Sequence, residues 1–362
     1  MSWSEKDYLY KLAMVRKLLS NLKVGALLIE QEANFAWLTG GRGFVGLGAE
    51  KSRAQLLITD ERVYLLTNNI EAGRILAEEV AGLPLELRDY PWWDEGALFS
   101  LVSRLTGARK WITDSQLGRD MARLRWQLLP GEIEAYREAG RLAAAAIEEV
   151  CFRIKPGVSE TTVAGWLAQE CLARGLTPTV LLVGADERAF EWRHPLPTKK
   201  RMGRYALLVL GARRYGLHVS CTRLVHFGPL PAELRKRHEA VCRIDAAYIA
   251  HTREGRSLGE IFQAGVEAYR KAGFPDEWGK HHQGGLTGYM GREILAGPGC
   301  QEQVKLYQAY AWNPSMSGVK SEDTLIVTEA GPEIITRSER FPQKEVMFGG
   351  FACLRPDILR RD

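Results

Sequence analysis

The chain of 362 residues is 46% hydrophobic and 26% charged, and its formal net charge is +5. This length predicts two domains, or one large one, with a sizeable core. Lys and Arg are interspersed with Asp and Glu, so the sequence lacks the basic stripe of a nucleic-acid-binding protein, and no apolar run approaches the roughly 20 residues that span a bilayer.

The N-terminal residues and the cysteines bear on the cellular compartment. Residues 1–20 hold no continuous apolar segment, so we expect no signal peptide. The six cysteines show no C-x-x-C spacing, which is typical of buried thiols rather than of a disulfide framework or a zinc site. We therefore expect a cytoplasmic protein with no membrane or nucleic-acid partner.

The first third of the chain alternates strand-like runs with amphipathic stretches. Helices are predicted at Glu5–Leu22, Glu71–Val80 and Glu95–Leu105, and strands at Gly25–Glu30, Ala54–Thr59, Val63–Thr67, Leu85–Arg88 and Lys110–Thr113. Strands that alternate with helices predict an α/β layer domain of about 120 residues.

The loop Gly40–Gly48 is the one segment of this part with a possible binding role. Its five glycines bracket Arg42 and Phe44. These two side chains either contact a ligand or lie on the surface of a flexible turn, and the sequence favours neither interpretation.

The remaining chain begins at a Leu-Leu-Pro-Gly-Glu segment, so we divide the chain into domains 1–127 and 128–362. The long helix Glu132–Ile154 ends at Pro156-Gly157, and Ser159 is a candidate N-cap for the next helix. Further helices are predicted at Val163–Ala173, Ala232–His251 and Leu258–Ala272, and strands at Thr179–Val183, Tyr205–Leu210, Tyr215–Val225, Ala309–Trp312 and Thr324–Thr328.

The central feature of this domain is a predicted hairpin within Gly203–Arg223. Its two strands, Tyr205–Leu210 and Tyr215–Val225, are joined by Gly-Ala-Arg-Arg. Alternation places His218, Ser220 and Thr222 on one face of the second strand and Val219, Cys221 and Arg223 on the other. Whether His218 lines a pocket or simply packs stays open.

This hairpin resembles the first metal-binding hairpin of the pita-bread family, which includes creatinase, prolidase, aminopeptidase P and methionine aminopeptidase. The matching positions are Gly203, Gly211-Ala212, Gly216 and Thr222-Arg223. The segment Ala26–Gly41 also resembles the creatinase and prolidase N-terminal domain, in which a strand leads into an Asn-x-x-Tyr-Leu-Thr-Gly turn. The resemblance implies an α/β N-terminal domain of the creatinase/prolidase type, followed by an α+β pita-bread C-terminal domain, in a homodimer.

Most metal ligands of the family are replaced at the matching positions. Where the family places Asp, Asp, His, Glu and Glu, this chain has Val209, Ser220, Gly285, Asn313 and Glu322. A pair of divalent cations requires several anionic oxygen ligands. We therefore expect no bound metal and no other cofactor.

The resemblance also indicates which polar residues form the site. We expect His194, His281, Arg292 and Glu322 to be catalytic, and His194 is placed two residues away from the family's spacing. The expected substrate-binding residues are His218, Ser220, Asn313, Lys320, Arg42 and Phe44, with the last two reaching a neighbouring subunit's pocket. We expect His282 to point away from His281, because neighbours in an extended strand face opposite sides. Cys221 is expected to be a buried structural thiol rather than a nucleophile.

Two classes of function follow from this pattern. One is a metal-independent hydrolase that cleaves a C–N bond of a small amino-acid-like, amide or peptide substrate, as creatinase does on this fold. The other is a non-catalytic peptide- or protein-binding module, as in a eukaryotic histone chaperone. We favour the enzyme, because the replaced positions form a polar set with imidazoles, Arg292, Lys320 and Glu322.

Overall fold

The computed structural model describes residues 3–337 and 340–362, which form two compact units, Met1–Gly131 and Glu132–Asp362. The division lies close to the predicted one after residue 127. Each unit is described on its own.

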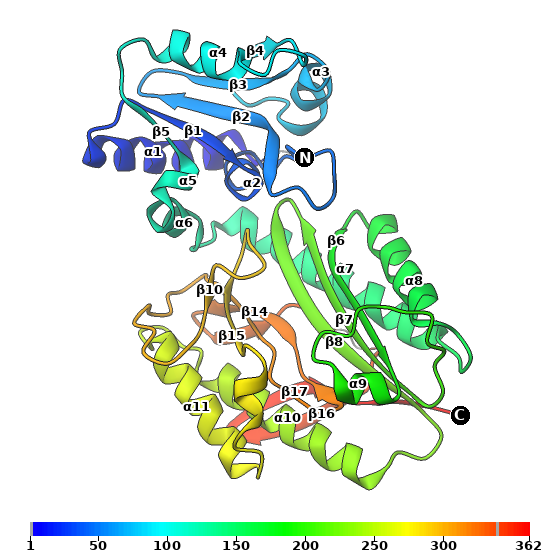
Figure 1. Ribbon diagram of the computed structural model, residues 1–362. Helices are drawn as coiled ribbons and strands as arrows, with labels where there is room; N and C mark the ends of the chain where they lie inside the picture. The colour runs from blue at the N-terminus through cyan, green and yellow to red at the C-terminus, as the bar shows by residue number, and fades with distance from the viewer. Residues whose placement is uncertain (1–2, 338–339) are drawn as a thin grey trace. The chain divides into compact units, whose positions relative to one another are not determined.

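The N-terminal unit is a five-stranded sheet with helices on both sides (Figure 1). The strand order is β4-β3-β2-β1-β5, and β5 and β4 run parallel to their neighbours β1 and β3. The elements are α1 Glu5–Leu22, β1 Ala26–Gln31, α2 Glu32–Thr39, β2 Lys51–Thr59, β3 Val63–Asn68, α3 Ala72–Arg74, the π-helix η1 Ile75–Glu79, β4 Glu86–Tyr90, α4 Ala97–Thr106, β5 Trp111–Thr113, α5 Asp114–Leu117 and α6 Arg119–Arg125.

The predicted α/β layers follow from the apolar patterns of these segments. Ser4 accepts a hydrogen bond from the backbone N–H of Asp7 and so caps α1, which buries Tyr8, Leu12, Val15 and Leu19 on one stripe. The resemblance placed an Asn-x-x-Tyr-Leu-Thr-Gly type of turn in the stretch that follows β1, and in the structure this stretch is helical up to Thr39. The chain forms α2 there and ends it at Gly40, whose φ of 77° lies in the left-handed region that favours glycine.

The C-terminal unit contains two larger antiparallel sheets, apart from the parallel edge strand β18. Their strand orders are β18-β8-β7-β6 and β10-β9-β11-β14-β15, and two-stranded pairs β12-β13 and β16-β17 complete the unit. The elements are α7 Pro130–Arg153, α8 Glu160–Ala173, β6 Thr177–Ala185, α9 Glu187–Glu191, β7 Tyr205–Arg214, β8 Leu217–Phe227, α10 Ala232–His251, α11 Leu258–Lys271, the 3-10 helix η2 Glu277–Lys280, β9 Gly284–Thr287, β10 Ile294–Leu295, β11 Ala309–Trp312, β12 Ser315–Met316, β13 Val319–Lys320, β14 Asp323–Thr328, β15 Gly331–Ile334, β16 Gln343–Phe348, β17 Phe351–Pro356 and β18 Leu359–Arg361.

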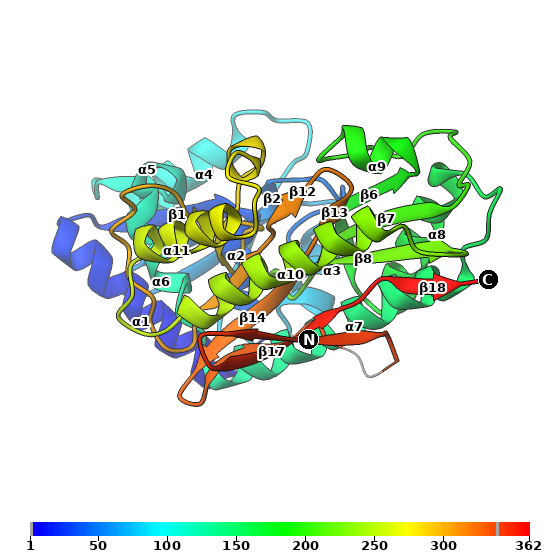
Figure 2. The ribbon, with the colours of Figure 1, turned by 90° about the horizontal axis from the view of Figure 1, so that it is seen from below.

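The two sheets meet where β8 lies beside the start of β14. The backbone N–H of Thr222 donates to the carbonyl of Glu322 over 3.0 Å, and that of Ser220 donates to Thr324 Oγ1 over 2.8 Å. Helix α8 packs on β6, while α10 packs on α11 and on strands β13, β16 and β17 (Figures 1 and 2). This junction brings the polar face of β8 against the segment that carries Glu322.

The predicted hairpin is confirmed, but its turn lies elsewhere. Gly211–Arg214 continues β7, and the chain reverses at Tyr215 and Gly216, whose φ angles are 53° and 80°. Two successive positive φ angles are typical of the tight turn that matches the twist of a hairpin. The late strands β15 to β18 were not predicted from the sequence.

A buried ionic network ties β8 to the helices and to the end of the chain. Arg223 pairs with Glu148 and with Asp323, each over 3.0 Å. Arg355 pairs with Asp245 over 2.6 Å and with Asp323 over 2.8 Å. All five side chains are buried, and such charges are tolerated because each has an opposite partner.

Five of the six cysteines are buried, as expected, whereas Cys300 is partly exposed. All six cysteines lie within the described part of the chain and are free, and Cys221 is buried, with burial raising the pKa of its thiol well above the usual value. Among residues 3–337 and 340–362, no helix combines the length and the apolar character that crossing a membrane requires.

Two helical glycines give a matched test of the packing in the C-terminal unit. A Cβ at Gly265 in α11 would lie 1.9 Å from the ring of Tyr248, which is itself stacked on Trp312 with centroids 4.7 Å apart. Gly165 in α8 is exposed and its Cβ position is open. We expect Gly265→Ala to destabilise the protein by about 1–3 kcal/mol through overpacking, and Gly165→Ala to stabilise it by about 0.5–1 kcal/mol. Urea unfolding of both variants checks this, and equal effects would show that α11 is not held against Tyr248.

Candidate functional site

A cavity of about 190 Å³, lined by both polar and apolar side chains, lies in the C-terminal unit where β6, β7 and β8 face segments that flank the strands of the second sheet. Seven of the ten residues predicted for the site line it: His194, His218, Ser220, Arg292, Asn313, Lys320 and Glu322. The other lining residues are Thr179, Val180, Leu182, Val209, Leu210, Gly211, His282 and Gly291. The structure therefore brings together side chains from five separate segments of the sequence.

Glu322 is the buried anion of this cavity, and two cations contact it. Lys320 Nζ lies 2.9 Å from one carboxylate oxygen, and Arg292 Nη2 lies 3.3 Å from the other. Thr222 Oγ1 donates to the first oxygen over 2.8 Å. Burial alone would raise the pKa of Glu322, but Lys320 and Arg292 outweigh it and lower this pKa to about 2. The carboxylate is therefore ionised at neutral pH and is a poor proton acceptor.

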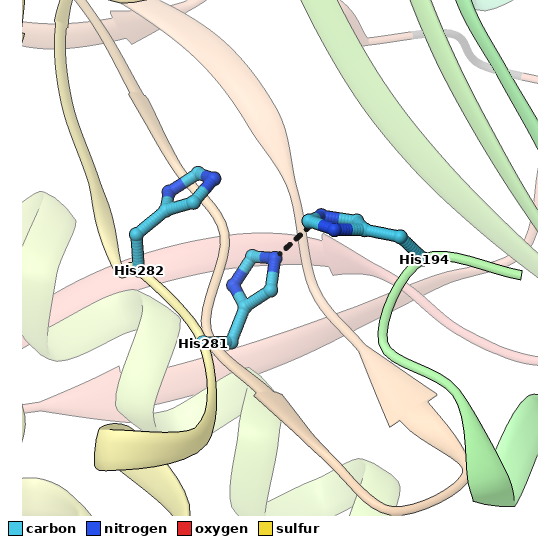
Figure 3. Close-up of side chains that lie close together, drawn as sticks. All are labelled: His194, His281 and His282. Atoms are coloured by element: carbon cyan, nitrogen blue, oxygen red, sulfur yellow. Dashed lines mark hydrogen bonds between the residues drawn. The ribbon is translucent and has the colours of Figure 1, made fainter.

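Three imidazoles gather at the cavity from two loops (Figure 3). His194 follows α9, whereas His281 and His282 follow η2. The Nε2 atoms of His194 and His281 lie 2.9 Å apart, so one donates a hydrogen bond and the other accepts it. Burial lowers the pKa of His281 to about 3 and that of His282 to about 4, with Lys320 among the cations that lower both further, and burial also lowers the pKa of His194.

The expectation that His282 points away from His281 was wrong. Their rings stack with centroids 4.4 Å apart and an angle of 26° between the planes. The alternation rule does not apply because strand β9 begins only at Gly284, so these two residues lie before the strand.

The positions that match the family's metal ligands do not fit a pair of divalent cations. Val209 offers no ligand atom, Ser220 and Asn313 are neutral, and Glu322 is already engaged by two cations. Gly285, which stands at the position of the family's ligand histidine, has no room for a side chain. Its φ is 148°, and a Cβ there would lie 2.2 Å from the carbonyl oxygen of Ile294 on the paired strand β10.

Several buried polar atoms at the site have no hydrogen-bond partner among the described residues. They are Arg292 Nε, Asn313 Oδ1 and His281 Nδ1. An unsatisfied buried polar group costs about 1–3 kcal/mol, so such groups in one place indicate a polar ligand or ordered solvent.

The remaining predicted residues are placed as follows. His281 contacts His194 at the cavity, as described above. Arg42 lies in the N-terminal unit, where its guanidinium pairs with the buried Glu79 over 2.8 Å. Phe44 lies in the same unit and is half-buried. That Arg42 and Phe44 reach a neighbouring subunit's pocket stays a prediction.

Sequence reasoning missed three contributions to the site. His282 was assigned to the wrong side, and the lining side chains of β6 were not considered. Thr222 was placed on the face of Ser220 but was given no role, although its hydroxyl binds Glu322. The match of Thr222-Arg223 to the family's Thr-Arg pair was the signal that could have indicated this role.

Comparison with known proteins supports the two-domain assignment. The sequence profile of the "Creatinase/Prolidase N-terminal domain" matches residues 11–148, and that of "Metallopeptidase family M24" matches residues 134–329. The fold is thus a creatinase/prolidase N-terminal domain followed by a pita-bread domain. The chain belongs to metallopeptidase family M24.

Individual relatives cover nearly the whole chain at low identity. An uncharacterized peptidase of Bacillus subtilis, YqhT, is 23% identical over 91% of this chain and 98% of its own length. The fold is similar to that of an Xaa-Pro dipeptidase from Bacillus anthracis, with a TM-score of 0.75 and 18% identity over 98% of this chain and 99% of that one. It is also similar to the N-terminal domain of the FACT complex subunit SPT16 from chickpea, with a TM-score of 0.71 and 13% identity over 93% and 97% of the two chains.

The stability contributed by Glu322 can be tested with a matched pair of variants. Glu322→Gln leaves Lys320 and Arg292 without their counter-charge, so we expect a loss of about 3 kcal/mol. Glu333→Gln removes a half-exposed ion pair with Arg137 and should cost less than about 1 kcal/mol. Denaturant unfolding at pH 7 measures both.

The stability difference between wild type and Glu322→Gln should depend on pH. Because the folded-state pKa of Glu322 lies below its usual value of 4.5, its stabilisation is present above that value and is lost as the pH falls towards 2. The gap between wild type and Glu322→Gln should therefore shrink over this range. A gap that is small at pH 7, or that does not shrink in acid, would contradict the ion cluster.

Proposed function

We propose that this chain is a hydrolase that cleaves a C–N bond in a small amino-acid-like substrate, an amide or a short peptide, without the two-metal centre of its family. The observation that carries the proposal is the clamp on Glu322 by Lys320 and Arg292. By resemblance, Glu322 stands at a position where family M24 has a metal-binding glutamate. Here two protein cations contact it instead.

The charges around the cavity favour a substrate that bears a carboxylate. Lys320 and Arg292 carry two positive charges against the single negative charge of Glu322. Arg292 Nε is buried and has no partner among the described residues, so it is available to donate to a carboxylate oxygen. A divalent cation pair would instead be repelled by these two side chains.

The other end of the substrate would be held through nitrogen. Asn313 Oδ1 is a buried acceptor without a partner among the described residues, which suits an ammonium or amide N–H. Glu322 is saturated by its own partners, so we assign it the role of positioning Lys320 and Arg292 rather than that of binding the substrate nitrogen. The volume of about 190 Å³ is below the roughly 300–1,000 Å³ of sites for drug-sized ligands, which favours a small substrate.

The acid–base chemistry would come from the histidine pair. His194 lines the cavity and its Nε2 is hydrogen-bonded to His281. A water molecule would lose a proton to the His194 imidazole as its oxygen attacks the scissile carbonyl carbon. The imidazolium would then give that proton to the leaving nitrogen, and the C–N bond breaks to give an acid and an amine. Arg292 and Lys320 would stabilise the negative charge that develops on the carbonyl oxygen.

The non-catalytic binding module remains the second candidate. The fold similarity to the N-terminal domain of SPT16 supports a scaffold that persists without peptidase chemistry, although at 13% identity it concerns the fold alone. The two candidates differ in turnover, which gives the decisive experiment.

The test of the enzyme measures amine release from a panel of amino-acid amides, guanidino acids and dipeptides in the presence of a chelator. We expect turnover that the chelator does not abolish. His194→Asn should lower kcat by about 100-fold or more, because general acid–base catalysis contributes roughly 10²–10⁴-fold. His251→Asn is the matched control, because His251 lies on α10 and is not among the residues that line the cavity.

Two results would contradict this proposal. Turnover that depends on added manganese, cobalt or zinc would favour a metalloenzyme. No turnover, together with a raised melting temperature in the presence of one of these compounds, would favour the binding module. A ligand at 100 times its Kd stabilises a protein by about 2.7 kcal/mol, so binding is readily detected.

A further inference from the structure

The histidine cluster at the cavity has a second chemical capacity besides acid–base catalysis. His194, His281 and His282 each offer a ring nitrogen, and these three atoms all lie within 4.8 Å of one another. We propose that the three imidazoles bind one divalent transition-metal ion of the zinc class, at a position distinct from the family's two-metal centre. This inference goes beyond the proposed hydrolase activity.

The separations between the ring nitrogens suit such an ion. Zinc binds imidazole nitrogen at about 2.0–2.1 Å in a tetrahedral arrangement, which places ligand nitrogens about 3.4 Å apart. The Nε2 atoms of His194 and His281 are 2.9 Å apart, slightly closer than this. The three ligand atoms lie within 4.8 Å of one another, so the His282 nitrogen has to approach by at most about 1.4 Å, and the His282 side chain is exposed. Figure 3 shows the three rings around one region, from the two loops that carry them.

The loops that carry the histidines are held together independently of any ion. Arg193, directly before His194, forms an ion pair with Glu277, which opens the helix η2 before His281. Gln283, fully buried directly after His282, donates to the carbonyl oxygens of Trp278 and His281 over 3.0 and 2.7 Å. This pairing fixes the two backbones before an ion arrives, as the surroundings of metal ligands commonly do.

The chemistry of the donors selects the class of ion. Three neutral nitrogen ligands suit zinc, copper, nickel or cobalt, whereas calcium and magnesium require oxygen ligands. His194 and His282 both line the cavity, so an ion on this cluster would present its fourth coordination position to the cavity.

A consequence follows if the proposed hydrolase activity is correct. An ion on His194 occupies the nitrogen that would accept a proton from water. Zinc would then inhibit this chain and a chelator would relieve the inhibition, the reverse of the behaviour of a metal-activated peptidase.

The test is equilibrium dialysis of the untagged full-length protein against zinc, after removal of metals with a chelator. We expect one equivalent of zinc per chain. Each of the variants His194→Asn, His281→Asn and His282→Asn should bind it more than about 100-fold more weakly, since loss of even a group next to a ligand costs 10–100-fold. His251→Asn, which lies on α10 away from the cluster, should keep the wild-type affinity. The visible absorption of bound cobalt supplies a second readout of tetrahedral nitrogen coordination.

The possible outcomes separate this inference from the proposed function. Absence of zinc binding, or zinc binding that survives His282→Asn, overturns the site. Two equivalents that are lost in Glu322→Gln would place metal at the family's centre and also overturn it. Because His282 is exposed, its variant carries the test if either of the other two fails to fold. The dialysis result stands whether or not the protein shows turnover.

Discussion

The arrangement of the candidate site depends on one buried carboxylate and the cations around it. Glu322 lies directly before β14, Lys320 ends β13, Arg292 lies before β10 and Thr222 lies on β8, so partners from three segments converge on its two oxygens. The neighbouring Asp323 turns the other way and pairs with Arg223 and Arg355 in the core. Adjacent residues of an extended chain face opposite sides. The Glu322-Asp323 pair therefore places one carboxylate in the cavity and one in the core.

The same junction explains how the fold is kept although four of the family's five metal-ligand positions carry other residues. The core network around Asp323 does not include the residues that replace the metal ligands, so these can vary without removing the charges that hold β8, β14 and β17 together. The replacements nevertheless have structural consequences of their own. At Gly285 the strand β10 approaches β9 so closely that no side chain fits, which closes off the position that a histidine would need.

Much of the fold could be predicted because its signals are local. The bounds of α1 and α10 follow from amphipathic periodicity together with capping residues or a preceding proline, and the helix after Ser159 was recognised from its N-cap. The hairpin turn was misplaced because Tyr215 adopts a positive φ, which a sequence pattern rarely indicates for a bulky residue. The site residues could be named from motifs. Their contacts could not, since the saturation of Glu322 depends on three segments that only the folded chain brings together.

In the arrangement described here, Lys320 and Arg292 occupy the surroundings of Glu322 in which the family would hold metal ions. Anomalous diffraction at the absorption edge, from crystals grown with excess manganese or zinc, tests it most directly. We expect no anomalous peak within about 2.5 Å of the Glu322 carboxylate, with Lys320 still at ion-pair distance from it. Two peaks flanking Glu322, with Lys320 and Arg292 turned away, would contradict it.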